Sequence, residues 1–329
     1  MFLTLIVSSL AAAQAVPTIG SGNAGSDQKL PFYGTSVSYG HQLTAYNPTP
    51  EVVAWSQRIG LMPEFHFNKH VFVRSRFYLS QELTLSDSTN TPHEVELSDL
   101  WFDGVWTGWK EQITGIKIAG DLRATLPTSK PSQAASRLFT LGPSLNLSRT
   151  FPVLAGLTLV YSGRFTWRFN RFATRQNAGG LITNCAGLGA PEACLNTATG
   201  MRNVQADLLH GPTVSFSPHE RFNISGTFLW QYAFLSPLSS VPAEFANVPE
   251  LQTNPANAVN TRDFVAFSLG VTWTPIDVMS LTLGAFTFST QLDTQSRYVF
   301  PLFNRNTVVS LDATFDIEAA VSSFTKEKK

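Results

Sequence analysis

Apolar and polar side chains alternate along most of this chain, and residues 155–172 show the pattern most clearly. One parity is apolar apart from Gly163, and comprises Leu157, Leu159, Tyr161, Phe165, Trp167 and Phe169. The other parity is polar except for Val160, and comprises Thr158, Ser162, Arg164, Thr166, Arg168 and Asn170. A period of two is strand geometry, because successive side chains point to opposite faces of a sheet. Long strands with one apolar face and one charged face are typical of a transmembrane β-barrel.

The same alternation predicts about twelve strands, with ten or fourteen as the alternatives. We expect them near residues 33–45, 57–67, 69–83, 95–107, 111–125, 137–148, 156–171, 204–216, 221–234, 262–274, 278–291 and 306–318. The predicted connections are alternately short and long. A barrel whose strands run up and down shows this asymmetry when tight turns lie at one rim and loops at the other. The fold class is therefore all-β, an antiparallel up-and-down transmembrane barrel over residues 33–318.

Composition agrees with a barrel and excludes other classes. The 329 residues are 43% hydrophobic and 14% charged, with a formal net charge of zero. This balance gives no electrostatic reason to expect a nucleic-acid partner. Past the first dozen residues no run of 18 apolar residues occurs, so no transmembrane helix is expected.

The two ends of the chain differ from the alternating region. Residues 1–15 have an apolar stretch followed by Ala13-Gln14-Ala15, which indicates a secretory signal peptide, with a buried N-terminal helix as the alternative. Residues 16–32 form a Gly/Ser-rich flexible lead-in. Its Gly-x-Gly-x-x-Gly spacing has no strand before it and no helix after it, so we take this match as accidental. Residues 319–329 form a C-terminal tail.

The only two cysteines, Cys185 and Cys194, lie in one long predicted connection. In an exported chain this close spacing suggests a disulfide, and two free thiols are the alternative. No histidine is near them to complete a metal site.

Parity also assigns the residues that face the barrel interior. The predicted pore-lining set is Arg74, Arg76, Tyr78, Glu82, Glu96, Asp99, Asp103, Lys117, Asp121, Arg123, Arg164, Arg168, Asp207, Asp312 and Asp316. A slip of one residue would put arginine in hydrocarbon, at a cost of roughly 2–4 kcal/mol near the midplane.

Three local features refine this assignment. Strand 95–107 alternates cleanly only if a bulge lies near Ser98 and Asp99. Folding the hairpins then brings Asp103 opposite Arg74 and Arg76, and Asp99 near Lys117, which predicts a ladder of opposite charges. Pro143 and Pro212 lie inside predicted strands and suggest bulges there, because proline lacks a ladder donor.

Two interpretations of the inward charges remain open. Mixed charges can bind the wall of a narrow barrel together. Alternatively, a basic cluster opposite acids forms a constriction that selects solutes.

The chain lacks the motifs of an enzyme. No histidine lies two residues from a serine on a predicted strand, and His66 beside Glu64 is a weak signal. No zinc-protease motif, phosphate loop, CxxC or nucleophile elbow occurs, so we expect neither catalysis nor a cofactor or metal.

The signal segment, the alternation, the loop asymmetry and the last strand, residues 307–317, together resemble Gram-negative outer-membrane β-barrel proteins of the porin-like or transporter-like kind. The resemblance implies a bacterial outer-membrane location, contact with lipid and lipopolysaccharide, and folding by the barrel-assembly machinery, which would read Phe315 or Phe324. It also implies a channel for passive passage of small hydrophilic or amphipathic solutes. The alternative is a closed-lumen structural, binding or adhesion barrel that acts through the loops at 172–203 and 235–261.

Overall fold

The computed structural model describes residues 33–45, 54–84, 93–176, 198–237, 260–291, 298–304 and 306–326. The predicted signal peptide, the lead-in and the two cysteines, Cys185 and Cys194, lie outside these residues. Within the described part, the chain forms a closed antiparallel barrel of twelve strands, as the alternation predicts.

Two of the twelve strands are interrupted and carry two labels each. The first of these is β2 with β3, and the second is β5 with β6. The barrel strands are β1 (Ser36–Thr44), β2 (Trp55–Met62), β3 (Glu64–His66), β4 (Val71–Glu82), β5 (Val95–Leu97), β6 (Leu100–Lys110), β7 (Lys117–Leu126), β8 (Arg137–Phe151), β9 (Gly156–Asn170), β12 (Val204–His219), β13 (Phe222–Leu235), β14 (Thr261–Ile276), β15 (Met279–Thr290) and β16 (Thr307–Asp316).

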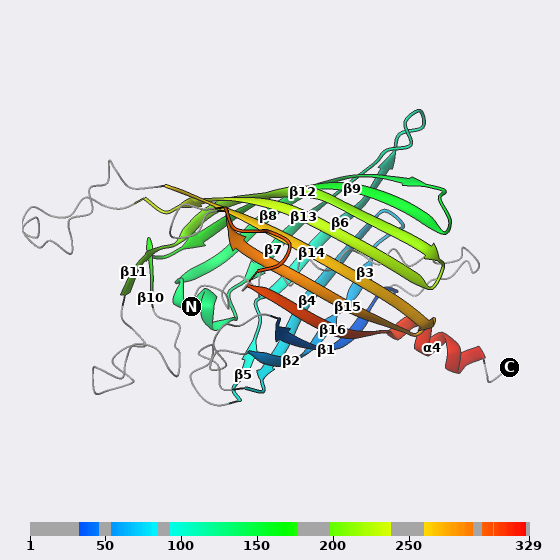
Figure 1. The fold of residues 1–329 in the computed structure, drawn as a ribbon, viewed down its shortest axis with the longest axis horizontal. Coiled ribbons are helices and arrows are strands. Elements are labelled where there is room, and N and C mark those ends of the chain that lie inside the picture. The colour runs from blue at the N-terminus through cyan, green and yellow to red at the C-terminus, as the bar shows by residue number, and fades with distance from the viewer. Residues whose placement is uncertain are drawn as a thin grey trace, which may run out of the picture.

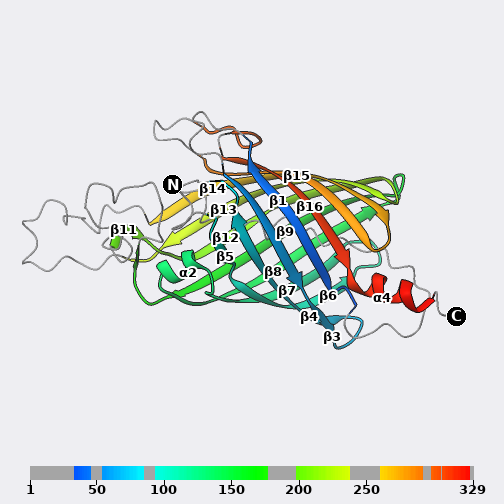
Figure 2. The same cartoon turned by 90° about the horizontal axis from the view of Figure 1, so that it is seen from below.

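Each strand pairs with its neighbours in the chain, and the first and last strands close the ring. The β1–β16 ladder runs from Ser36 opposite Asp316 to Thr44 opposite Val308. Figures 1 and 2 show the strands tilted around one long axis. The short connections lie at the right-hand end of Figure 1, which we call the short-turn end. The long connections lie at the opposite, long-loop end.

The outer surface of the barrel is apolar. On β9, Leu159 is 43% exposed and Trp167 is 47% exposed, and Leu122 on β7 and Leu283 on β15 exceed half exposure. Arg164 and Arg168, which have the opposite parity on β9, instead make ion pairs with residues on other strands. An outward apolar band with charges on the inner face is what a lipid-facing barrel requires.

The bulge expected at Ser98 and Asp99 is confirmed. The register of β5 and β6 against β4 shifts by one residue between the pairs Leu79–Leu97 and Arg76–Trp101. Ser98 fills the gap, because its backbone N–H donates to Tyr78 O at 2.9 Å and its hydroxyl accepts from Tyr78 N at 2.8 Å. The shift puts Glu96 on the same face as Asp103, because their partners Ser80 and Arg74 share a parity on β4.

The bulges expected at Pro143 and Pro212 are wrong. Pro143 is opposite Leu122 and Pro212 is opposite Tyr161, in ladders whose register is unbroken there. Each proline is paired on one side only, and the ladder on its other side resumes in the same register. The missing N–H therefore removes a local bond without inserting a residue.

The β6–β7 connection also differs from the prediction. Strand β6 continues to Lys110, through the expected turn at 108–110, and the strand expected to begin at 111 begins at Lys117. Glu111 explains the displacement, because its carboxylate accepts the backbone N–H of Ile113 at 2.7 Å and the Thr114 hydroxyl at 2.6 Å. These bonds stabilise a turn in place of a strand.

Four further elements were not expected. The short helix α2 (Lys130–Ala134) lies in the connection between β7 and β8, and β10 (Thr174–Gln176) pairs with β11 (Ala198–Arg202) beyond β9. Helix α4 (Ile317–Lys326) ends the described chain and projects from the short-turn end in Figure 1. None of the helices in the described residues is long and apolar enough to cross a membrane.

Candidate functional site: the inner wall of the barrel

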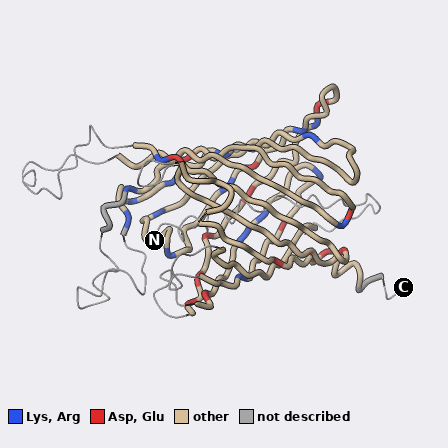
Figure 3. The backbone as a smooth tube through the Cα atoms, in the orientation of Figure 1, with Lys and Arg blue, Asp and Glu red and all other residues tan. Residues whose placement is uncertain are grey.

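The inner wall has a charged side and an apolar side. Charged residues lie on the inner faces of β2 to β9, whereas β1, β13 and β15 carry no Asp, Glu, Lys or Arg. Figure 3 shows this difference, with blue and red positions sparse along the strands at the front. A solute inside the barrel would therefore meet ionic groups on one side and side chains of different chemistry on the other.

Asp103 is the centre of the charged side. Its side chain is 1% exposed and accepts from Arg123 Nε at 2.6 Å and Nη2 at 3.1 Å, and from Arg74 Nη2 at 3.4 Å. Arg74 also lies 3.6 Å from Glu64, which in turn contacts His66 at 3.3 Å. The predicted pairing of Asp103 with Arg74 is thus present, and it belongs to a chain of alternating charges that reaches the short-turn end.

Trp101 is an inward-facing aromatic residue beside this cluster. It is 7% exposed, and the guanidinium carbon of Arg123 lies 4.1 Å from the centre of its ring. Arg76, which is 2% exposed, lies 5.7 Å from the same ring. Cations over an indole face are attracted by its quadrupole, so Trp101 helps to hold two arginines in place.

A second group of charges joins β7, β8 and β9. Arg164 Nη2 donates to Asp121 Oδ1 at 2.8 Å, and the hydroxyl of Ser144 donates to the other oxygen of Asp121. Gly142 lies beside this group, where a Cβ would be 3.2 Å from Phe165 O, a tight contact, and 3.7 Å from the Arg164 side chain, an ordinary one. Arg164 is therefore bound along the wall by a fully engaged carboxylate.

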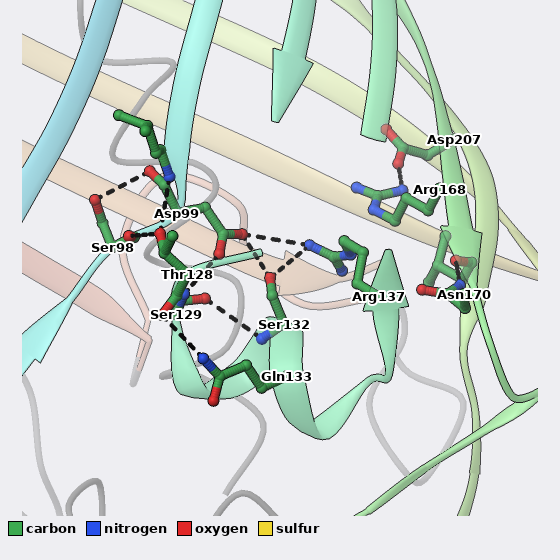
Figure 4. Close-up of polar contacts among 12 residues, drawn as sticks. Ser98, Asp99, Thr128, Ser129, Ser132, Gln133, Arg137, Arg168, Asn170 and Asp207 are labelled. Carbon is green, nitrogen blue, oxygen red and sulfur yellow. Dashed lines mark hydrogen bonds and ion pairs between the residues drawn. The ribbon is translucent and has the colours of Figure 1, made fainter. Parts of the chain in front are cut away.

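Asp99 has different partners from the expected one. The predicted proximity of Asp99 to Lys117 is wrong, because the register places Lys117 opposite Lys110 and Ser148 at the short-turn end. Asp99 lies at the long-loop end, where it accepts from Ser129 N at 2.9 Å and Ser132 Oγ at 2.5 Å. Figure 4 shows that it anchors helix α2 to the junction of β5 and β6.

The remaining predicted residues are spread over the wall. Asp312 pairs with Arg58 at 2.8 Å, and the Arg58 guanidinium lies 5.3 Å from the centre of the Tyr78 ring. Glu82 accepts from Thr84 Oγ1 at 3.1 Å, and Glu96 lies 3.9 Å from Lys130. Arg168 pairs with Asp207, and Asp316 caps α4 by accepting from Ala319 N at 2.9 Å. The predicted set is thus several clusters at different heights. That all of it lines a pore stays a prediction.

The apolar side of the interior was not predicted. Leu229, Ala266, Phe286 and Phe288 form a cluster, each at most 5% exposed, with Leu209 and Phe264 packed against it. The register places Ala266 opposite both Leu229 and Phe288, while the neighbouring Leu269 is 47% exposed on the other face. Apolar residues therefore occupy both faces of these strands, which weakens the alternation.

Three other inward residues were missed. Arg58 has the parity opposite to the exposed Ile59, so alternation alone could have found it. Trp101 shares its parity with Asp103, but an aromatic residue is expected on the lipid face. Arg137 faces inward only because the strand has a bulge at Leu138. The sequence indicates that bulge only by two successive apolar residues, Leu138 and Phe139.

The closed antiparallel ring, the apolar outer band and the charged inner wall define a transmembrane β-barrel of the outer-membrane type. Such a barrel belongs in a bacterial outer membrane, with lipid against its outer face. Within the described residues, no group of three or more His, Cys, Asp or Glu side chains could hold a metal ion.

Comparisons with solved structures give distant likenesses. The chain is similar to the KdgM porin, with 7% sequence identity, coverage of 86% of this chain and 99% of that chain, and a TM-score of 0.42. It is similar to the NanC porin, with 9% identity, coverage of 86% of this chain and 100% of that chain, and a TM-score of 0.43. It is also similar to the transport unit of the autotransporter AIDA-I from Escherichia coli, with 9% identity, coverage of 95% of this chain and 97% of that chain, and a TM-score of 0.43. No family model and no curated protein matches the chain.

Proposed function

We propose that the protein is an outer-membrane channel for the passive passage of small hydrophilic or amphipathic solutes. The observation that carries this proposal is the two-sided interior, with ion-paired arginines on β4 to β9 and the Phe286–Phe288 cluster on β13 to β15. A wall with both characters contacts a solute that has polar and apolar parts. We place the long-loop end outside the cell and the short-turn end in the periplasm, as in bacterial barrels.

The inward arginines stabilise the wall through ion pairs between strands, and they also set the charge balance of the interior. Arg164 is compensated by Asp121 and Arg168 by Asp207, so wild-type selectivity between small ions should be weak. Removal of one arginine leaves an uncompensated carboxylate facing the interior. Both interpretations of the charge ladder therefore apply to the same residues.

The test is the conductance of purified, detergent-refolded protein in planar bilayers. We expect stepwise conductance in potassium chloride, and a reversal potential in a salt gradient that moves toward cation selectivity for Arg164→Ala. Arg149→Ala, near the short-turn end of β8, provides a control of equal charge change. A silent bilayer for correctly folded wild-type protein would overturn the channel proposal. An unchanged reversal potential for Arg164→Ala would remove Arg164 from the selectivity of the channel.

A further inference from the structure

Arg137 and Arg168 lie together on the inner face at the long-loop end of β8 and β9. A register shift between Arg137 and Phe139 puts both Arg137 and Thr140 on the inner face. Arg137 is then opposite Asn170, and Thr140 is opposite Arg168. These four residues form a contiguous group on two adjacent strands, which we call the mouth cluster.

Each guanidinium of the mouth cluster is held from one side by an acid. Arg137 Nη1 donates to Ser132 Oγ at 2.8 Å and to Asp99 Oδ2 at 3.5 Å, and Arg168 pairs with Asp207 on β12. Figure 4 shows Asp99 and helix α2 on one side of the two arginines and Asp207 on the other. The two acids therefore fix the orientation of both guanidiniums and occupy only part of their donors.

The two guanidiniums of the mouth cluster lie close enough to repel each other electrostatically. Each has one carboxylate partner, Asp99 for Arg137 and Asp207 for Arg168. An additional anion between them would relieve the repulsion of the two cations.

Several polar atoms of the mouth cluster are buried without a partner. Among the described residues, Arg137 Nε, Thr140 Oγ1 and Asn170 Oδ1 find none, and Thr140 is only 6% exposed. A buried polar atom that lacks a hydrogen bond destabilises the folded protein. An empty binding site for a polar ligand has this property, because its buried donors and acceptors gain their partners only when the ligand binds.

We propose that the mouth cluster binds the oxyanion of a solute, a carboxylate or a phosphate, as the solute enters the channel. The proposal deepens the channel function given above and rests on it. Guanidinium groups of Arg137 and Arg168 donate to the oxyanion in the fork geometry that suits both ligands. The Thr140 hydroxyl donates to the same group, and Asn170 Oδ1 accepts from a hydroxyl or a bound water of the solute.

Isothermal titration calorimetry on the full detergent-folded protein tests this without requiring conductance. Inorganic phosphate and succinate are titrated separately, with neutral succinamide as the uncharged probe. We expect both anions to bind more tightly than succinamide, and the tighter of the two identifies the favoured oxyanion. Arg168→Gln should weaken binding about tenfold or more, as expected when one charge-assisted contact is lost. Arg149→Gln is the matched control on β8 and should bind as the wild type does.

Thr140→Val keeps the test decisive if Arg168→Gln does not fold, because it is nearly isosteric and removes only the hydroxyl. It should weaken anion binding while heat-modified electrophoretic mobility remains that of a folded barrel. The proposal is overturned if neither anion binds the wild-type protein, or if a folded Arg168→Gln or Thr140→Val variant binds as tightly as wild type. Conductance with no anion binding would reject the mouth cluster and leave the channel intact. Binding in a silent barrel would reject the channel, and with it the role of the cluster in solute entry.

Discussion

Replacement of Asp103 by asparagine removes one negative charge from the centre of the inner wall at nearly constant volume. Asp103 accepts three contacts from Arg74 and Arg123, and its side chain is 1% exposed. Asparagine keeps one acceptor oxygen, so part of the bonding survives. Removing one member of a buried charge pair costs about 3–5 kcal/mol, and the 13–20% exposure of the two arginines favours the lower end. We expect Asp103→Asn to lower the free energy of unfolding by about 3 kcal/mol.

The measurement is urea unfolding of the protein folded in lipid vesicles, followed by tryptophan fluorescence. Asp312→Asn is the matched control, because Asp312 has one arginine partner, Arg58, and both side chains are 13–15% exposed. That variant should lose about 1.5 kcal/mol, the lower end for hydrogen bonds to a charged group, because asparagine keeps an acceptor oxygen for Arg58. If Asp103→Asn loses no more than Asp312→Asn, the inner wall is not organised around Asp103 and the reasoning from its contacts fails.

Three other predictions concern the outer face, a turn and the cysteines. Leu159→Arg should lower the free energy of unfolding by roughly 2–4 kcal/mol if that position lies near the bilayer midplane. The measurement is the yield of protein refolded into lipid vesicles, which should fall. An unchanged refolding yield contradicts the assignment of Leu159 to the lipid face. Hydrogen bonds from the Thr114 hydroxyl and nearby backbone N–H groups lower the pKa of Glu111, so its stabilising contribution is present above the unfolded pKa and is lost as pH falls through the folded one. Thr114→Ala should therefore raise that pKa toward its ordinary value in an NMR titration, and an unchanged titration contradicts the assignment. Peptide mass mapping without reductant should recover Cys185 and Cys194 in one linked peptide, whereas two separately alkylated cysteines would show free thiols.

Much of the barrel could be predicted because lipid on one side and charge on the other impose a strict period of two. Residues 156–170 show the point, since Leu159 and Trp167 are exposed outside while Arg164 makes its ion pair inside. The bulge at Ser98 was also predictable, because a change of parity within one strand has few other structural causes. In these segments every residue is subject to the same constraint of the membrane.

The inner wall was harder to predict because parity gives the face of a residue and says little about its height. Asp99 and Lys117 both face inward by parity, yet the register separates them toward opposite ends of the barrel. Register depends on where each turn closes. The β6–β7 turn lies several residues beyond its expected position, where the Glu111 carboxylate accepts from the Ile113 N–H and the Thr114 hydroxyl. The Phe286–Phe288 cluster was missed because alternation disappears when both faces of a strand are apolar.

The ladder between β1 and β16 means that the barrel can close only after its twelfth strand has been made. Until residues 307–316 are present, β1 and β15 each have a free edge, and every pair from Ser36–Asp316 to Thr44–Val308 is missing. Exposed strand edges recruit other strands, including those of neighbouring unfolded chains. A nascent chain must therefore be kept from aggregating until its first and last strands meet, and a truncation that removes β16 would leave an open sheet.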